Sequence, residues 1–281
     1  MVDKSTTFKL LKNVDGNYKF VDEPFPKPQS GEVLIQVHYS SFNPLDRFLY
    51  FTAKLERVGS EGSGIVTAIG EDVAQSYLGK KVSFMHQAWA EYKIAKADEV
   101  IILDDSQDLA KAANAMVNPL SAVGILEIAR QRNVKVLVQT AAASQLGKQV
   151  IALMKAEGIQ TINIVRREEQ FKQLKSLYGC EYVLDSSKPE FVQDLQGLIN
   201  ELEPTLLIDY LAGELPGQIF QIMPAESQLV IVGVLTSTEI VIKAGNLLYG
   251  DKTVRGFRCS NGSIRKAKKK DLRYTKELQM I

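Results

Sequence analysis

The chain has 281 residues, which exceeds the usual size of a single hydrophobic core, so we expect two lobes. Its residues are 45% hydrophobic and 24% charged, as is typical of a globular protein. The formal net charge of +1 creates no general attraction for nucleic acid, and no apolar run is long enough to span a membrane.

Strand and turn signals dominate residues 1–115. The pair Asp15-Gly16 favours a tight hairpin turn between two apolar runs, Phe8–Leu11 and Tyr18–Val21. Further strands are predicted at Glu32–Tyr39, Gly64–Ile69 and Lys81–Phe84. We therefore expect a small, irregular lobe resembling a β-barrel.

Residues 116–260 instead alternate between helix and strand patterns. A long apolar helix is predicted over Ala112–Arg130, with a break at Pro119. Strands are predicted at Val134–Val138, Thr161–Val165, Tyr182–Leu184, Leu206–Asp209, Leu229–Val232 and Thr253–Phe257, with helices Leu146–Lys155, Glu168–Leu177, Glu190–Leu202 and Pro216–Ile222 between them. This alternation predicts an α/β fold with a doubly wound parallel sheet in the strand order 3-2-1-4-5-6.

Residues 261–281 form a basic segment with a helical pattern. We interpret it as a solvated helix face, and a contact with an acidic partner or a membrane is the alternative.

The turn after the first strand of the parallel sheet resembles a dinucleotide-binding fingerprint. Ala142 and Ser144 replace the first two glycines of G-x-G-x-x-G, and Gly147 keeps the third. Small residues allow a pyrophosphate near the backbone, and the helix N-terminus offers it free N–H groups. The predicted cofactor-binding residues here are Ala142, Ser144, Gln145, Leu146 and Gly147. A vestigial turn without cofactor is the alternative.

The second strand of this sheet runs into Arg166-Arg167, where an NAD site usually has Asp or Glu. Two guanidinium groups can grip a 2′-phosphate, so the sequence predicts NADP(H) as the cofactor. A pair of surface arginines is the alternative interpretation. Gly213, Gly233 and Val234 follow later strands at the same edge and are further candidates for cofactor binding.

Several motifs, in the right order along nearly the whole chain, carry a family resemblance. They are Asn43-Pro44-Leu45-Asp46, Gly59–Val66 with Ile69-Gly70, Gly79–Val82, Val117–Ala122, Thr140–Gly147, Asn163–Arg166 and Arg255–Phe257. Together they resemble the zinc-less medium-chain dehydrogenase/reductase superfamily, in its branch of quinone oxidoreductases and trans-2-enoyl reductases. The resemblance implies a GroES-like lobe followed by a Rossmann domain, and it adds Asn118 to the cofactor-binding residues.

Zinc-containing members need thiolate and imidazole ligands. This chain has Asn43, Ser60 and Asn118 at the matching positions, and its two histidines, His38 and His86, lie on separate elements. We therefore expect no metal. With only Cys180 and Cys259, a disulfide framework is also excluded.

The resemblance implies hydride transfer from NADPH to a quinone, an enone or an enoyl thioester as the small-molecule substrate. Asn43 is a candidate polar group at the nicotinamide, and Tyr50 is a candidate proton donor. We expect a cytoplasmic location, with the mitochondrion as the alternative, since the N-terminal residues are typical of neither a secretory signal nor a transit peptide.

Two departures from the family keep a second interpretation open. Only Arg47–Val58 fills a segment that is longer in the family, and the chain stops at Ile281 without the usual strands that return to the first lobe. A catalytically reduced or inactive subunit with a structural role in a larger assembly, in the mitochondrion or elsewhere, is therefore the alternative to an active enzyme. A nucleotide-sensing module is a third interpretation. We expect the chain to be a homodimer or a subunit of a larger complex.

Overall fold

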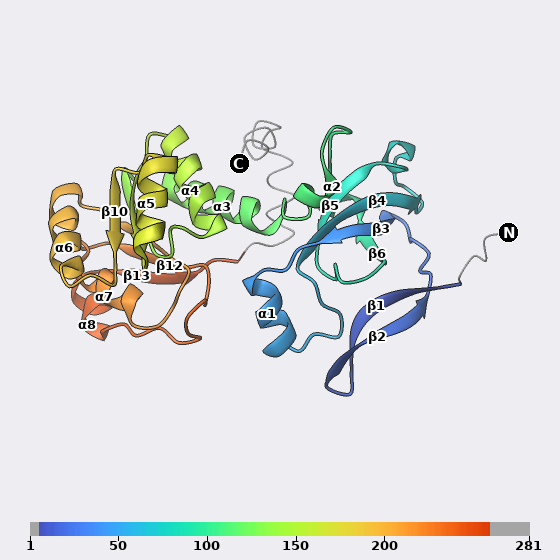
Figure 1. Ribbon diagram of the computed structural model, residues 1–281, viewed down its shortest axis with the longest axis horizontal. Helices are drawn as coiled ribbons and strands as arrows, with labels where there is room; N and C mark the ends of the chain where they lie inside the picture. The colour runs from blue at the N-terminus through green and yellow to red at the C-terminus, as the bar shows by residue number, and fades with distance from the viewer. Residues whose placement is uncertain (1–5, 259–281) are drawn as a thin grey trace. The chain divides into compact units, whose positions relative to one another are not determined.

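The computed structural model describes residues 6–258 (Figure 1). The chain divides into two compact units between Leu120 and Ser121. The sequence placed this boundary after residue 115, whereas it lies within helix α3 (Val117–Gln131). The predicted basic tail, 261–281, lies outside the described residues. None of the helices in the described range has the length and apolar character needed to cross a membrane.

The first unit begins with the predicted hairpin, formed by β1 (Thr7–Val14) and β2 (Asn17–Pro24). The strands pair antiparallel, with Val14 opposite Asn17. Asp15 and Gly16 both have positive φ angles, 53° and 85°. Positive φ at both central residues matches the right-handed twist of the strands, so the prediction of a tight turn is confirmed.

A five-stranded antiparallel sheet in the order β6-β3-β4-β5-β7 forms the rest of this unit. Its strands are β3 (Glu32–Ser40), β4 (Glu61–Ile69), β5 (Lys81–Met85), β6 (Tyr92–Lys96) and β7 (Ile101–Ile102). Valine, isoleucine and phenylalanine side chains from these strands and the loops beside them make one buried cluster. The β-rich lobe is confirmed, although β6 and β7 were not predicted.

Short helices complete the unit: α1 (Pro44–Phe51), α2 (Leu109–Ala112), and the 3-10 helices η1 (Gln75–Tyr77) and η2 (Ala97–Glu99). The bounds predicted for the helix over Ala112–Arg130 are wrong, because α2 ends at Ala112 and α3 starts at Val117. Pro119 lies inside the first turn of α3 rather than at a break. Proline is tolerated there because the N–H that it lacks would have no intrahelical acceptor.

The second unit contains a six-stranded parallel sheet in the order β10-β9-β8-β11-β12-β13. Its strands are β8 (Val136–Gln139), β9 (Gln160–Val165), β10 (Tyr182–Asp185), β11 (Leu206–Asp209), β12 (Gln228–Ile231) and β13 (Thr253–Gly256). Its helices after α3 are α4 (Gln145–Ala156), α5 (Glu168–Tyr178), α6 (Phe191–Leu202), α7 (Leu215–Ile222) and α8 (Ala244–Tyr249). The order is the predicted 3-2-1-4-5-6, and only α8 was not foreseen.

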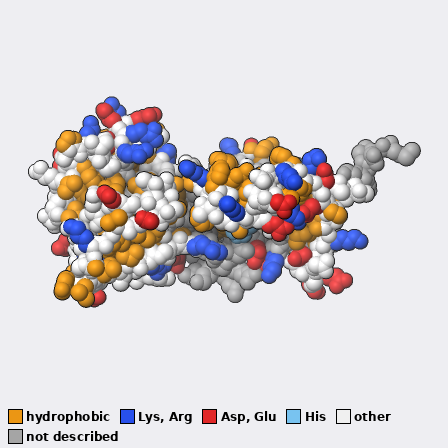
Figure 2. Space-filling view, turned by 90° about the horizontal axis from the view of Figure 1, so that it is seen from below, with side chains coloured by type: hydrophobic (Ala, Val, Ile, Leu, Met, Phe, Trp, Pro, Cys, Tyr) orange, Lys and Arg blue, Asp and Glu red, His pale blue; other side chains and the backbone are white. Residues whose placement is uncertain are grey.

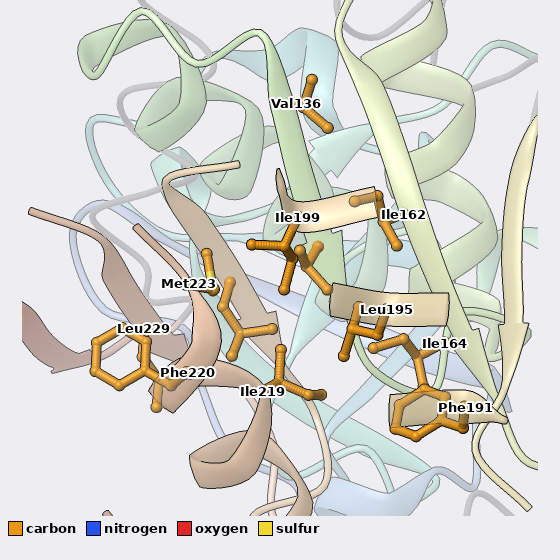
Figure 3. Close-up of a cluster of buried hydrophobic side chains, with 12 residues drawn as sticks. Val136, Ile162, Ile164, Phe191, Leu195, Ile199, Ile219, Phe220, Met223 and Leu229 are labelled. Carbon is orange, nitrogen blue, oxygen red and sulfur yellow. The ribbon is translucent and has the colours of Figure 1, made fainter. Parts of the chain in front are cut away.

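Alternate residues of the parallel strands face two different helical layers. Val136, Ile162 and Leu229 pack against α6 and α7 in a buried apolar cluster (Figure 3). Val165 and Val183 belong to a second cluster with residues of α4 and α5, which includes Cys180. Cys180 is thus a small core residue, with only 8% of its surface exposed.

Candidate cofactor and substrate sites

The turn after β8 packs tightly against the first turn of α4. A Cβ atom on Gly147 would lie 2.5 Å from the main-chain oxygen of Ala142, too close for any side chain. The hydroxyl of Ser144 accepts a hydrogen bond from the Gly147 N–H at 3.0 Å and so caps α4. Position 147 therefore requires glycine, because the helix start and the turn backbone are in contact.

Three main-chain N–H groups of this turn have no acceptor within residues 6–258: those of Ala143, Gln145 and Leu146. They lie at the N-terminus of a 12-residue helix, where free N–H groups and the helix dipole attract anions. The neighbouring N–H groups of Ala142 and Ser144, by contrast, donate to main-chain oxygens. The turn therefore offers a phosphate several unused donors.

Strand β9 ends directly before Arg166 and Arg167, whose side chains are both exposed. Neither guanidinium pairs with a carboxylate of the described chain. The Arg166 N–H donates to Gln170 Oε1, and Arg167 is the N-cap residue of α5. Because β8 and β9 are parallel neighbours, these two cations and the free N–H groups lie at the same edge of the sheet.

The end of β11 is fixed to the turn after β8. The hydroxyl of Thr140 donates to Asp209 Oδ1 at 2.7 Å, and the same carboxylate accepts main-chain N–H bonds from Leu211 and Ala212. Burial raises the pKa of Asp209, and its hydrogen bond from Thr140 opposes the rise. Asp209 therefore shapes the turn into Gly213, whose φ of 78° favours glycine.

The remaining predicted cofactor residues divide between the two units. A Cβ atom on Gly233 would lie 2.8 Å from the main-chain oxygen of Tyr210, so the chain after β12 passes close to the end of β11. Val234 follows with its side chain 44% exposed. Asn118 instead lies in the first turn of α3 and belongs to the first unit. The carboxyl edge of the sheet thus brings together every predicted cofactor residue except Asn118.

In the first unit, a fully buried carboxylate caps α3. Glu61 Oε2 accepts hydrogen bonds from the N–H groups of Met116 at 3.0 Å and Val117 at 2.8 Å. Its side chain is completely buried, and burial raises the pKa of Glu61 to about 7 against the opposing effect of these two bonds. Asp46 is equally buried and accepts a hydrogen bond from the Ser60 N–H. Neither carboxylate was singled out by the sequence as a site residue.

Asn43 lies at the centre of this polar cluster. Its Oδ1 atom accepts the N–H of Leu45 at 2.9 Å and caps α1. Its amide nitrogen donates to Ser60 Oγ at 2.8 Å and to Glu61 Oε1 at 3.2 Å. A primary amide has two N–H donors, and both are used inside the protein. The geometry therefore supports a positioning role for Asn43, and its predicted catalytic role remains a prediction.

Tyr50 lies in a cluster of aromatic rings. Its ring stacks on Tyr18 with the centroids 4.1 Å apart, and Trp89 lies 6.3 Å away. Phe42 stacks against Trp89 with the ring centroids 5.7 Å apart, and it is 78% exposed. The Tyr50 hydroxyl makes no hydrogen bond to any described residue. The rings thus hold Tyr50 in place, and its O–H group has no partner in the described part of the chain.

Two family profiles match the chain. The alcohol dehydrogenase GroES-like domain matches residues 29–105, and the zinc-binding dehydrogenase domain matches residues 146–274. These are the two parts of one architecture, a β-rich lobe followed by a Rossmann-type domain. Their order agrees with the two units described above.

Individual relatives are similar to the chain over most of its length. The mitochondrial enoyl-acyl-carrier-protein reductase of Caenorhabditis elegans is 27% identical over 245 residues, which are 82% of this chain and 70% of the relative. A structure from Mesorhizobium loti, provisionally assigned as an NADPH:quinone reductase, is 29% identical, with a TM-score of 0.85, covering 98% of this chain and 88% of that one. A mycobacterial protein complexed with NADPH has a TM-score of 0.76 at 21% identity, covering 93% and 87%.

Fold, profiles and relatives together define a two-lobed dehydrogenase-type protein. The chain belongs to the medium-chain dehydrogenase/reductase superfamily. The matched part spans 70% of the nematode relative but only 55% of the length of a plant enoyl reductase.

Proposed function

We propose that the chain is an NADPH-dependent oxidoreductase that reduces a quinone, an enone or an enoyl thioester without zinc. The main observation behind this proposal is a set of N–H groups at the start of α4 that have no acceptor within residues 6–258. They lie beside two exposed arginines at the end of β9, which pair with no carboxylate of the same residues. A pyrophosphate suits the N–H groups, and a 2′-phosphate suits the guanidinium pair. Relatives named quinone oxidoreductase and enoyl reductase support the reaction class.

The residues present fit a nicotinamide dinucleotide on structural grounds. A side chain at position 147 would fill the space that the turn keeps clear, and the N–H groups of Ala143, Gln145 and Leu146 would hold the pyrophosphate. Arg166 and Arg167 would hold the 2′-phosphate. When bound, NADPH supplies the hydride.

Tyr50 is the better candidate of the two for proton transfer. Its phenol O–H has no hydrogen-bond partner within residues 6–258, whereas both amide hydrogens of Asn43 are used by Ser60 and Glu61. In the proposed reaction Tyr50 donates a proton to the reduced substrate and recovers one from solvent. Asn43 acts indirectly, because it caps the helix that carries Tyr50.

The proposal that the reaction proceeds without zinc rests on the side chains at the positions that match the family's zinc ligands. The positions that match the family's zinc ligands carry Asn43, Ser60 and Asn118, none of which provides a thiolate or an imidazole. Within residues 6–258, no three His, Cys, Asp or Glu side chains lie close enough together to bind a metal ion. Polarisation of the substrate would therefore come from hydrogen-bond donors.

A homodimer is proposed for the active form. Strand β13 forms the outer edge of the parallel sheet, and α8 exposes Leu248 at 73% and Tyr249 at 87%. Hydrophobic side chains gather on the face of the second unit that carries α7 and α8 (Figure 2). Light scattering at several protein concentrations measures the mass directly, and a constant monomer mass excludes the dimer.

The cytoplasm is the proposed location, with the mitochondrion named for several relatives as the alternative. Fractionation of cells that produce the tagged chain distinguishes the two.

One experiment tests the central proposal. NADPH and NADH are titrated into the purified chain, and NADPH oxidation is then followed with a quinone and with an enoyl thioester. Tight binding of NADPH with turnover supports the enzyme. Binding without turnover on either substrate class favours the inactive-subunit alternative, and no binding rejects the cofactor assignment.

A further inference from the structure

Three buried polar side chains cross the sheet of the second unit on the side covered by α4 and α5. Gln139 on β8 and Asn163 on β9 are completely buried, and Tyr210, directly after β11, is 3% exposed. Such positions in a parallel sheet are normally apolar. A buried polar chain is retained at little cost only when all its members are hydrogen-bonded, and it then fixes one arrangement of the elements that it joins.

Gln139 is the centre of this chain. Its Oε1 atom accepts the Tyr210 hydroxyl at 3.2 Å, and its Nε2 atom donates to Asn163 Oδ1 at 2.8 Å and to the main-chain oxygen of Gly147 at 3.3 Å. Both donors and the acceptor of one amide are therefore used. Because strand neighbours Gln139 and Asn163 lie directly opposite each other, their side chains share one face of the sheet.

Asn163 extends the chain to the edge of the sheet. Its Nδ2 atom donates to Thr161 O at 3.0 Å within β9 and to Tyr182 O at 3.1 Å on β10. Asn163 thereby clamps β9 between its two neighbours, three residues before Arg166. The clamp therefore lies on the strand that ends directly before the arginine pair.

Tyr210 extends the chain in the other direction. Its main-chain N–H donates to Thr140 Oγ1 at 3.0 Å, and its main-chain oxygen is the atom that leaves no room for a side chain at Gly233. Burial raises the pKa of the Tyr210 phenol, so it stays a neutral donor. This arm thus adjoins the glycines after β11 and β12.

We propose that Gln139 is a positioning residue whose three hydrogen bonds set the phosphate turn, the arginine pair and the end of β11 relative to one another. The inference rests on the proposed NADPH binding and deepens it, because it assigns cofactor preference to a residue that does not contact the cofactor. The two arms have different consequences. The Asn163 arm governs the 2′-phosphate, which only NADPH has, while the Tyr210 arm adjoins a part of the site that both cofactors share.

The test measures dissociation constants of NADPH and NADH for the full chain and three variants. Asn163→Leu is expected to weaken NADPH about tenfold and NADH less than about twofold. Tyr210→Phe, which removes only a hydroxyl, is expected to weaken both cofactors equally. Gln139→Met, which removes all three bonds at similar side-chain length, is expected to weaken both and also to lower the preference for NADPH.

A matched control is Gln196→Met, which removes an amide-to-amide bond of 2.9 Å to Asn200 on the exposed side of α6. It is expected to leave both constants unchanged. Thermal unfolding of each variant identifies loss of fold, and a general loss of stability does not alter the ratio of the two constants. If Gln139→Met does not fold, the two single-arm variants still decide the question.

The outcomes distinguish a failure of the proposed NADPH binding from a failure of the positioning role of Gln139. If the unaltered chain fails to bind NADPH, the proposed function is rejected and this inference with it. If the chain binds NADPH but Asn163→Leu leaves the NADPH-to-NADH ratio unchanged, the proposed function stands and the positioning role of Gln139 is rejected.

Discussion

The carboxylate of Glu61 accepts the main-chain N–H of Val117 at 2.8 Å, although 56 positions separate the two residues in the chain. The same side chain accepts a hydrogen bond from Asn43, which caps α1. One buried carboxylate therefore joins β4, the start of α1 and the start of α3. These contacts give the first unit an internal polar framework that can be tested by titration.

Glu61→Gln is expected to change the pH dependence of stability. Burial raises the pKa of Glu61 from 4.5 to about 7, so between these values the folded chain binds a proton that the unfolded chain has released. Stability therefore falls as the pH rises through this window, by about 3 kcal/mol. The glutamine variant lacks this fall, which urea unfolding at about pH 5 and about pH 8 measures. An identical fall in the variant would contradict the assignment.

Lys93 should have the opposite effect at higher pH. Its ammonium donates to the main-chain oxygens of Met85 at 2.7 Å and His86 at 2.6 Å, and burial lowers the pKa of Lys93 from 10.5 to about 7. Between these values the unfolded chain binds the extra proton, so stability rises with pH, by about 5 kcal/mol at most. Lys93→Met removes this rise, and the exposed Lys96→Met on the same strand serves as its control.

Two helical glycines of the second unit should respond oppositely to alanine. Gly147→Ala places a Cβ atom against the Ala142 backbone and is expected to cost about 1–3 kcal/mol and to weaken NADPH binding. A Cβ atom on Gly197 in α6 meets nothing within 4 Å, so Gly197→Ala is expected to stabilise by about 1 kcal/mol. Chemical unfolding measures both changes. Equal effects of the two substitutions would argue against the tight turn.

The double change Arg166→Ala and Arg167→Ala is expected to weaken NADPH about tenfold to a hundredfold and to leave NADH nearly unchanged, because only NADPH has the 2′-phosphate. Fluorescence titration with each cofactor provides the constants. Lys135→Ala is the matched control, since this exposed cation precedes β8 at the opposite edge of the same sheet. Loss of affinity for both cofactors alike would remove the phosphate-clamp interpretation.

Tyr50→Phe keeps the stacked ring and removes only the hydroxyl. Under the proposed mechanism kcat is expected to fall about a hundredfold while thermal stability changes little, because the hydroxyl makes no bond in the described structure. Steady-state assays with a quinone measure kcat and KM separately. Tyr249→Phe, at a side chain that is 87% exposed, provides the comparison. An unchanged kcat would contradict the assignment of Tyr50 as the proton donor.

Much of the second unit could be predicted because its signals are local. The apolar strands, the helices between them and the turn at Gly147 all follow from patterns within a few residues, and right-handed crossovers then restrict the sheet order. The first unit was predicted less completely. Helix α1 was missed because its start depends on Asn43 and Asp46, which cap it through side-chain bonds in a segment for which no helix was predicted.

The sequence by itself determined the two-lobed architecture, the strand order and the residues at the carboxyl edge of the sheet, since periodicity and chain chirality act over short distances. Only the tertiary structure decided which buried polar groups are paired. Within residues 6–258, the amide donors of Asn43 are both used, the hydroxyl of Tyr50 has no partner, and Gln139 makes three bonds. Each of these outcomes depends on segments far apart in the chain. Hydrogen bonds require contact within about 3.5 Å, and no local pattern specifies which distant residues come that close.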